Sequence, residues 1–415
     1  MGFLRSLNPQ LPRSVQTLQL GGLANAFGNG IVLPFTFIYL HNVRGIGLGM
    51  IGLILATNAA VSLVAGPVTG TLVDRVGGKR LLAVSLLFLT LGYGGYAFVH
   101  HPWQGFVTAA VTGIGNGAFW PAQSTLIAGL TPESKRTPAF AMQRVVMNLG
   151  IGLGALTGGL VASTSHPGSF ELLFFVDAAT FLVYLAVLWI LVPEVPPAPR
   201  GGASERSGGY ADVLRNRPFR AVLLVNTIFI FAGFAGFDLV AVYAKNQAGV
   251  DEREIGLVFL VNTLVIVVAQ LPIVKLVEGR RRMATLGLMG FVWAGAWLLV
   301  PVAGIWLRGT AAATLLAVAV GVFGIGECLH GAVQAPLVTD LAEPDLIGRY
   351  MALSALSWQV GFMLGPAVGG FAIALSPHGT WIGAAAICGA TGLLALALEP
   401  LLPHHARHTP QATPA

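Results

Sequence analysis

Residues 48–73 read LGMIGLILATNAAVSLVAGPVTGTLV, residues 74–80 read DRVGGKR, and residues 81–100 read LLAVSLLFLTLGYGGYAFVH. The two apolar runs flank a short charged loop, and each is long enough to cross roughly 30 Å of hydrocarbon as an α-helix. Runs of this kind recur along the whole chain. They predict twelve spanning helices, at about 17–40, 48–73, 81–100, 104–130, 138–162, 170–192, 219–244, 254–277, 284–304, 311–338, 349–375 and 379–402.

The composition agrees with a chain that lies mostly in lipid. Its mean hydropathy is +0.76, 55% of the residues are hydrophobic and 10% are charged, whereas soluble globular chains carry about 25% charged residues. The runs lack the alternation of outer-membrane barrel strands, and helices satisfy their own backbone hydrogen bonds. We therefore expect an all-α membrane protein. The two cysteines, Cys328 and Cys388, fall inside predicted spans and predict neither a disulfide framework nor a metal site.

The distribution of basic residues predicts the topology. If the N-terminus is cytoplasmic, the inner segments carry eighteen of the 23 Lys and Arg residues, and the outer loops carry only Arg44, Lys245, Arg253 and Arg308. This asymmetry places both termini in the cytoplasm under the positive-inside rule. The same distribution explains the net charge of +6, because basic residues line the anionic leaflet of the membrane. We therefore expect no nucleic acid as a partner.

An internal repeat divides the chain into two halves. An offset of 211 residues pairs Gly113-Ile114-Gly115 with Gly324-Ile325-Gly326, and it also pairs Gln123 with Gln334. Between the halves, residues 193–218 are rich in proline, glycine, serine and arginine, which is typical of a flexible linker. We expect an N-terminal six-helix bundle at 1–192, a cytoplasmic linker at 193–218, and a C-terminal six-helix bundle with a short cytoplasmic tail at 219–415.

The loop between the second and third spans carries the most specific motif. Residues 70–82, GTLVDRVGGKRLL, resemble the G-x-L-a-D-r-x-G-r-k-x-x-l loop of the major facilitator superfamily. The second-half counterpart, residues 274–282, keeps Gly279, Arg281 and Arg282 and has no Asp. The resemblance extends over the twelve spans, the linker and the repeat, and within the superfamily the chain looks most like the twelve-span drug/proton antiporters. It implies the major facilitator fold, with two pseudo-symmetric bundles that work by alternating access.

The same motif implies a cytoplasmic gate. We expect Asp74 to engage the start of the eleventh span near Arg349, because a carboxylate can accept charge-assisted bonds or cap a helix. A pure topology signal is the alternative. The gating residues are Gly70, Leu72, Asp74, Arg75, Gly77, Lys79 and Arg349.

The fifth span resembles the glycine-rich antiporter motif, although Ala155 replaces its proline. The eleventh span keeps the Gly-Pro form intact. Close helix packing and a role in the direction of transport are both open. The helix-packing residues are Gly150, Gly154, Gly158, Gly159, Gly361, Gly365, Pro366, Gly369 and Gly370.

Four ionisable residues lie inside predicted spans, where charges are costly and are functional candidates. Glu327, near the centre of the tenth span, is the first candidate for proton coupling, because burial favours a carboxyl that binds and releases a proton. Asp238 and Asp177 are further candidates, with an outer-gate role open for Asp238 and a structural role for Asp177. Arg144 can either bind an anionic substrate or neutralise Glu327.

Polar and aromatic side chains predict a central cavity. Each has packing or lipid contact as the alternative. The predicted cavity residues are Arg144, Asn148, Asn116, Gln123, Gln334, Gln359, Asn25, Asn29, Asn58, Phe119, Trp120, His330, Trp358 and Phe234.

These features together indicate a transporter rather than an enzyme, since zinc-binding pairs, nucleophile elbows and phosphate-binding loops are missing from the sequence. We expect a monomeric multi-pass protein of the bacterial cytoplasmic (inner) membrane that binds a small-molecule substrate, protons and lipids. It has no cofactor, and protons are the coupling ion. The expected function is proton-coupled export of lipophilic or cationic small molecules, as in multidrug efflux. The alternative is a transporter of one polar or anionic metabolite, such as a sugar, amino acid or siderophore, bound through Arg144.

Overall fold

The computed structural model describes residues 11–194, 210–343 and 346–409, and within these ranges the structure is helical and contains no β-strand. The chain is divided into two compact units. The first contains residues 1–46 and 57–201, and the second contains residues 47–56 and 202–415. Residues 195–209 of the predicted linker lie outside the described residues, and a short helix, α9 (Tyr210–Arg215), follows them.

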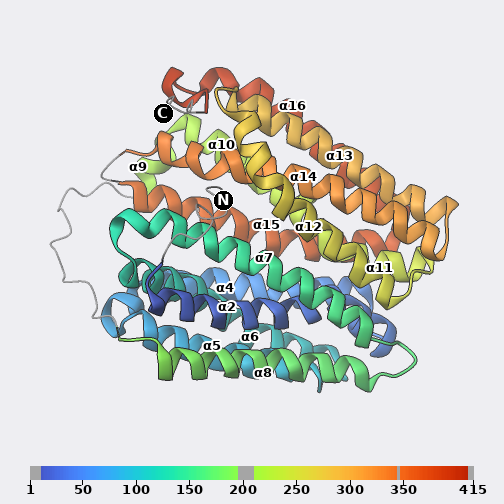
Figure 1. Ribbon diagram of the computed structural model, residues 1–415. Helices are drawn as coiled ribbons and strands as arrows, with labels where there is room; N and C mark the ends of the chain where they lie inside the picture. Colours follow the sequence, from blue (N-terminus) through green and yellow to red (C-terminus); the bar gives the residue numbers. More distant parts are fainter. Residues whose placement is uncertain (1–10, 195–209, 344–345, 410–415) are drawn as a thin grey trace, which may run out of the picture. The chain divides into compact units, whose positions relative to one another are not determined.

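The first unit is built from the helices drawn in blue and green in Figure 1. They are α2 (Arg13–Val32), α3 (Thr36–Ile38), the π-helix η1 (Tyr39–Val43), α4 (Leu48–Val76), whose first residues belong to the second unit, α5 (Gly78–Tyr96), α6 (Pro102–Leu130), η2 (Glu133–Lys135), α7 (Arg136–Val161) and α8 (Gly168–Leu191).

The second unit follows in light green through red in Figure 1. After α9 it contains α10 (Arg217–Phe229), the π-helix η3 (Ile230–Phe234), α11 (Ala235–Ala248), α12 (Glu252–Val277), α13 (Arg282–Trp306), α14 (Gly309–Leu341), α15 (Ile347–Leu375), α16 (Pro377–Leu398), η5 (Glu399–Leu401) and η6 (His404–Ala406).

These elements supply the twelve predicted spans, because α2 with α3 and η1 forms the first span and α10 with η3 and α11 forms the seventh. Within the described residues, ten of these spans are long and apolar enough to cross a membrane by length and composition alone. The other two are α5, which carries the basic Lys79 and Arg80 in its first turn, and α6, which is rich in glycine, threonine and amide side chains. Both are nevertheless continuous helices at the predicted positions, so the all-helical fold is confirmed.

The helix packing repeats between the units, as duplicated halves require. In the first unit α2 packs against α7 and α8, and α5 packs against α6 and α8. In the second unit the first span packs against α15 and α16, and α13 packs against α14 and α16. Each of these pairs in the first unit therefore has its counterpart in the second.

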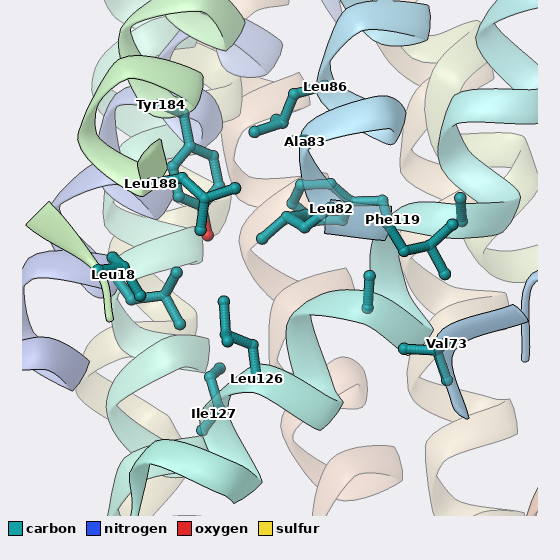
Figure 2. Close-up of a cluster of buried hydrophobic side chains, with 14 of the residues drawn as sticks. Leu18, Val73, Leu82, Ala83, Leu86, Phe119, Leu126, Ile127, Tyr184 and Leu188 are labelled. Atoms are coloured by element: carbon teal, nitrogen blue, oxygen red, sulfur yellow. The ribbon is translucent and has the colours of Figure 1, made fainter. Parts of the chain in front are cut away.

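The core of the first unit lies among α2, α5, α6 and α8 (Figure 2). Leu82 and Leu86 of α5, Leu126 of α6 and Leu188 of α8 are fully or almost fully buried there. Because lipid is as apolar as leucine, such contacts hold the helices by close packing rather than by exclusion of water.

Candidate functional site: intramembrane polar groups

Glu327 lies on α14 and is half-buried. The side-chain amide of Asn262, on the neighbouring α12, donates to Glu327 Oε2 at 2.8 Å and to the Val320 carbonyl at 3.1 Å. Asn262 is itself buried, so its orientation is fixed by these two acceptors. The predicted coupling carboxyl is thus held by a specific donor.

One turn along α14, His330 belongs to a buried hydrogen-bonded chain. His330 Nε2 lies 2.8 Å from Asn226 Oδ1, and Asn226 Nδ2 donates to Ser357 Oγ at 2.7 Å. Ser357 in turn donates to the Ser354 carbonyl. Since the Asn226 nitrogen is used toward Ser357, its oxygen faces the imidazole, and the network assigns the proton of the neutral ring to Nε2. This hydrogen-bonded chain of side chains connects α10, α14 and α15.

Aromatic rings surround His330. The Phe234 ring lies 5.6 Å from the His330 ring and 5.0 Å from Trp358, and Trp358 lies 5.3 Å from His330. Trp293 and Phe323 extend the group, with their centroids 4.8 Å apart. Phe234 sits in the π-helix η3, a local widening that often marks functional sites in helices. We call these five residues, Phe234, Trp293, Phe323, His330 and Trp358, the aromatic cluster.

The other two predicted coupling carboxyls lie in different surroundings. Asp238, in the first turn of α11, is half-buried and has no hydrogen-bond or ion-pair partner among the described residues. Asp177 of α8 is fully buried beside Gly28 and Thr180, and neither carboxyl oxygen has a hydrogen-bond partner within the described ranges. This enclosed position beside α2 fits the structural alternative for Asp177.

Several predicted cavity residues bond or pack against other residues of the first unit. Gln123 of α6 donates to the Tyr184 hydroxyl at 2.9 Å and accepts a bond from Gln143 of α7. Phe119 is also buried, within the core cluster of Figure 2, which fits the packing alternative for this side chain. Both side chains are held by neighbours in their own bundle, so they brace helices of the first unit.

Other amides of the first unit are half-buried and bridge helices. Asn116 of α6 donates to Asn58 of α4 at 3.2 Å, and Asn29 of α2 donates to the Tyr93 hydroxyl of α5 at 3.3 Å. Asn25 is half-buried on α2. Trp120 is 44% exposed beside the Phe119 ring.

Arg144 is exposed on α7, and the Asn148 amide donates to its carbonyl. The guanidinium forms no ion pair within the first unit's described residues. Its pairing with Glu327 would join the two units and stays a prediction. In the second unit, Gln334 is buried on α14 and Gln359 is half-buried on α15.

The loop motif closes a tight turn between α4 and α5. Gly77 has φ +86°, a conformation that side chains disfavour, and this explains the glycine at that position. Lys79 donates to the carbonyls of Val192 at 2.6 Å and Trp189 at 3.3 Å, where a cation stabilises the C-terminal end of α8. Arg80 pairs with Glu194 at 3.0 Å. The side chain of Asp74 lies outside the described set, so its link to the half-buried Arg349 stays a prediction.

The glycines of the fifth span face α2 directly. A Cβ on Gly150 would lie 2.6 Å from Ala26 Cβ, and one on Gly154 would collide with the carbonyl of Phe27. In the second unit, a Cβ on Gly361 would lie 2.5 Å from Ile230, and one on Gly369 would lie 2.6 Å from Leu239. Close helix packing is therefore what these glycines provide in the structure.

The sequence interpretation missed Asn226, Asn262 and Ser357. The two asparagines carry the same signal that selected Asn116, an amide within an apolar run. Their partners, however, lie more than sixty residues away along the chain, and such pairings depend on the tertiary packing.

Two units built from membrane-length helices that bury polar side chains are typical of membrane transporters. The family model of the Major Facilitator Superfamily matches residues 18–247 and 223–414. The chain belongs to this superfamily and is a transporter, not an enzyme.

Relatives with more specific names are similar over most of the chain. The Na(+), Li(+), K(+)/H(+) antiporter of Planococcus maritimus is 24% identical over 375 residues, 81% of this chain and 84% of the relative. Multidrug resistance protein MdtH of Cronobacter sakazakii is 24% identical over 360 residues, 85% of each chain. Among solved structures, the nucleoside transporter NupG superposes with a TM-score of 0.75 at 12% identity, covering 94% of this chain and all of that one, which shows the shared fold.

Proposed function

We propose that the protein is a proton-coupled secondary transporter that exports lipophilic or cationic small molecules by alternating access. The observation that carries the proposal is Glu327, a half-buried carboxyl within a membrane helix that is held by Asn262. On the same helix, Glu327 lies one turn from His330 and one turn from Phe323, two members of the aromatic cluster. The relatives named as a cation/proton antiporter and a multidrug resistance protein support this proposal.

Glu327 suits proton exchange for a chemical reason. The Asn262 N–H can bond a carboxyl oxygen in either protonation state, so the carboxyl can gain or lose a proton while it keeps this partner. A carboxylate in a low-dielectric site is costly unless a proton or another cation neutralises it. A cationic substrate and a proton therefore compete for the same group.

The aromatic cluster suits the apolar part of such a substrate. Aromatic faces attract cations by about 0.5–2 kcal/mol, most strongly when water is excluded. Phe234 and Trp358 are half-buried and face His330, so their rings have free surface to offer. A planar lipophilic cation would place its ring on them and its charge toward Glu327.

We extend the proposal to the setting of the protein. It works as a monomer in the bacterial cytoplasmic membrane with both termini in the cytoplasm, in keeping with the Lys and Arg distribution. In this proposal protons are the coupling ion, and the protein uses no cofactor.

The test is ethidium flux in proteoliposomes with an imposed pH gradient. We expect ethidium movement that collapses when an uncoupler is added and that falls at least about tenfold in Glu327→Gln. Glu343→Gln is the matched control, because Glu343 is an exposed carboxylate just beyond the end of the same helix. Gradient-driven flux that survives Glu327→Gln unchanged would reject Glu327 as the coupling site.

A second candidate function rests on Arg144. Its guanidinium is exposed on α7 and has no ion-pair partner within its own unit's described residues, which favours an anionic substrate. Arg144→Gln would then abolish thermal stabilisation of the protein by anionic metabolites and leave stabilisation by ethidium intact. Stabilisation of the wild type by ethidium, together with no stabilisation by anionic metabolites, would support the export of cations instead.

A further inference from the structure

The cytoplasmic loop between α12 and α13 has an unusual charge pattern. Three consecutive arginines, Arg280, Arg281 and Arg282, follow Gly279, whose φ is +69°. The acid of the loop itself, Glu278, is exposed and has no ion-pair partner among the described residues. The loop must find its carboxylate partners elsewhere.

The C-terminal tail supplies one of them. Glu399, directly after α16, accepts two bonds from Arg281, from Nε to Oε1 at 2.6 Å and from Nη2 to Oε2 at 2.5 Å. The Glu399 side chain is 4% exposed. This two-pronged geometry fixes both orientation and distance, and it is stronger than a single contact.

The tail backbone also joins the loop. The Arg282 N–H donates to the Arg407 carbonyl at 2.8 Å, and the Thr409 N–H donates to the Arg280 carbonyl at 3.0 Å. Arg281 and His408 form an isolated antiparallel bridge. Leu402, Ala406 and Thr409 are buried along the same segment. The tail is thus docked by its backbone as well as by its side chains.

The end of α14 is tied to the same loop. Arg282, which is 1% exposed, donates to Asp340 at 2.5 Å. His405 of the tail lies 3.3 Å from the Asp340 carbonyl. The loop between α12 and α13, the end of α14 and the tail therefore form one connected group within the second unit.

We propose that residues Glu399–Thr409 act as a strap that locks the cytoplasmic ends of α12, α13 and α14 together, with Glu399 as the positioning residue on which the lock depends. The strap provides Glu399, the carboxylate that pairs with Arg281. The loop's own acid, Glu278, does not fill this role among the described residues. The strap makes this end of the second unit move as one body, and its release leaves the Arg282–Asp340 ion pair to hold the loop against α14.

Hydrogen exchange of the purified full-length protein tests the strap directly and independently of transport. In Glu399→Gln, we expect the backbone amides of residues 278–286 to exchange at least about tenfold faster than in the wild type, since loss of a protecting contact raises the population of open forms. The matched control is Glu278→Gln, which should leave the exchange of the same loop unchanged.

Two results would overturn the proposal. One is loop exchange in Glu399→Gln that equals the exchange in Glu278→Gln. The other is faster exchange spread evenly over both units, which would mean that Glu399 only stabilises the fold. Glu399→Asp keeps the charge and should recover part of the protection. A chain that ends at Leu398 should show at least the effect of Glu399→Gln, and a smaller effect would also count against the strap.

A second readout rests on the proposed export of cations. Because the strap lies away from the aromatic cluster, we expect Glu399→Gln to lower the maximal rate of ethidium flux and to leave the half-saturating concentration unchanged. A change confined to the half-saturating concentration would contradict a role in helix movement. Failure of ethidium transport in the wild type would reject the proposed function and leave the exchange result standing.

Discussion

At the scale of single residues, one amide holds Glu327, the proposed coupling carboxyl. Asn262→Leu keeps a similar shape and removes both of the bonds that the amide donates, to Glu327 and to the Val320 carbonyl. We expect gradient-driven ethidium flux to fall about tenfold, which corresponds to about 1.4 kcal/mol, because Glu327 loses its orientation. Flux equal to the wild type, in protein that is properly folded, would show that Glu327 does not depend on Asn262.

The buried chain through Asn226 has a role in stability. Asn226→Leu leaves His330 Nε2 and Ser357 Oγ without this partner, and an unsatisfied buried polar group costs about 1–3 kcal/mol. We expect a clear fall in the melting temperature in detergent. Thr227→Val is the control on the next residue, because that hydroxyl bonds only the Leu223 carbonyl within its own helix. Equal melting temperatures for the two variants would contradict a stabilising role for the hydrogen bonds of Asn226.

Sequence reasoning reached some of these residues and missed others for a physical reason. Glu327 and His330 stand out because ionisable groups are costly in apolar helices. Phe119 was predicted to line the cavity, with packing as the alternative, and it is buried in the core cluster. The sequence did not distinguish the two, because aromatic residues at helical spacing are equally typical of packing. The Arg281–Glu399 pair could not be predicted, because the two residues are 118 positions apart and neither lies within a motif that names the other.

At the scale of elements, the contact between α2 and α7 depends on glycine. In Gly154→Ala, the added methyl group would collide with the Phe27 carbonyl, and backbone cannot yield as a side chain can. We expect a large loss of thermal stability and of folded yield, measured by size-exclusion chromatography and melting temperature.

The control for this prediction is Gly66→Ala on α4. No atom lies within 4 Å of an added Cβ there, so alanine should be tolerated or should stabilise by up to about 1 kcal/mol through helix propensity. If Gly154→Ala folds as well as Gly66→Ala, then α2 and α7 do not require the close approach that the structure shows.

Helix positions followed from the apolar runs with small differences at the ends. The seventh span, expected at 219–244, is interrupted by the π-helix η3 at Ile230–Phe234. Hydropathy does not report such a change in winding, because it leaves the apolar character of the run intact. The feature matters for function, since η3 carries Phe234 of the aromatic cluster.

At the scale of the whole molecule, the duplication is visible in buried polar bonds as well as in packing. In the first unit the Gln19 amide of α2 donates to the Ala139 carbonyl of α7 at 3.3 Å. In the second unit the Asn226 amide of α10 donates to Ser357 of α15 at 2.7 Å. The first span of each unit is therefore bonded to the fifth by a buried amide.

The units differ in where ionisable groups lie. In the second unit, Glu327 and His330 lie on one helix, α14, and each has a defined partner. In the first unit, the fourth span, α6, carries the amides of Asn116 and Gln123. The repeat in the sequence predicted the shared scaffold. The same offset of 211 residues pairs Asn116 with Glu327, and this difference in residue type supports the proposal that proton exchange belongs to the second unit.

The most direct test of the central claim is proton release on substrate binding. Purified protein in weakly buffered detergent solution is mixed with ethidium, and the pH is followed with a dye. We predict that ethidium releases protons from the wild type and from Glu343→Gln, and that Glu327→Gln binds ethidium without releasing protons. Equal proton release from Glu327→Gln and the wild type would contradict the assignment of Glu327 as the group that exchanges a proton for substrate.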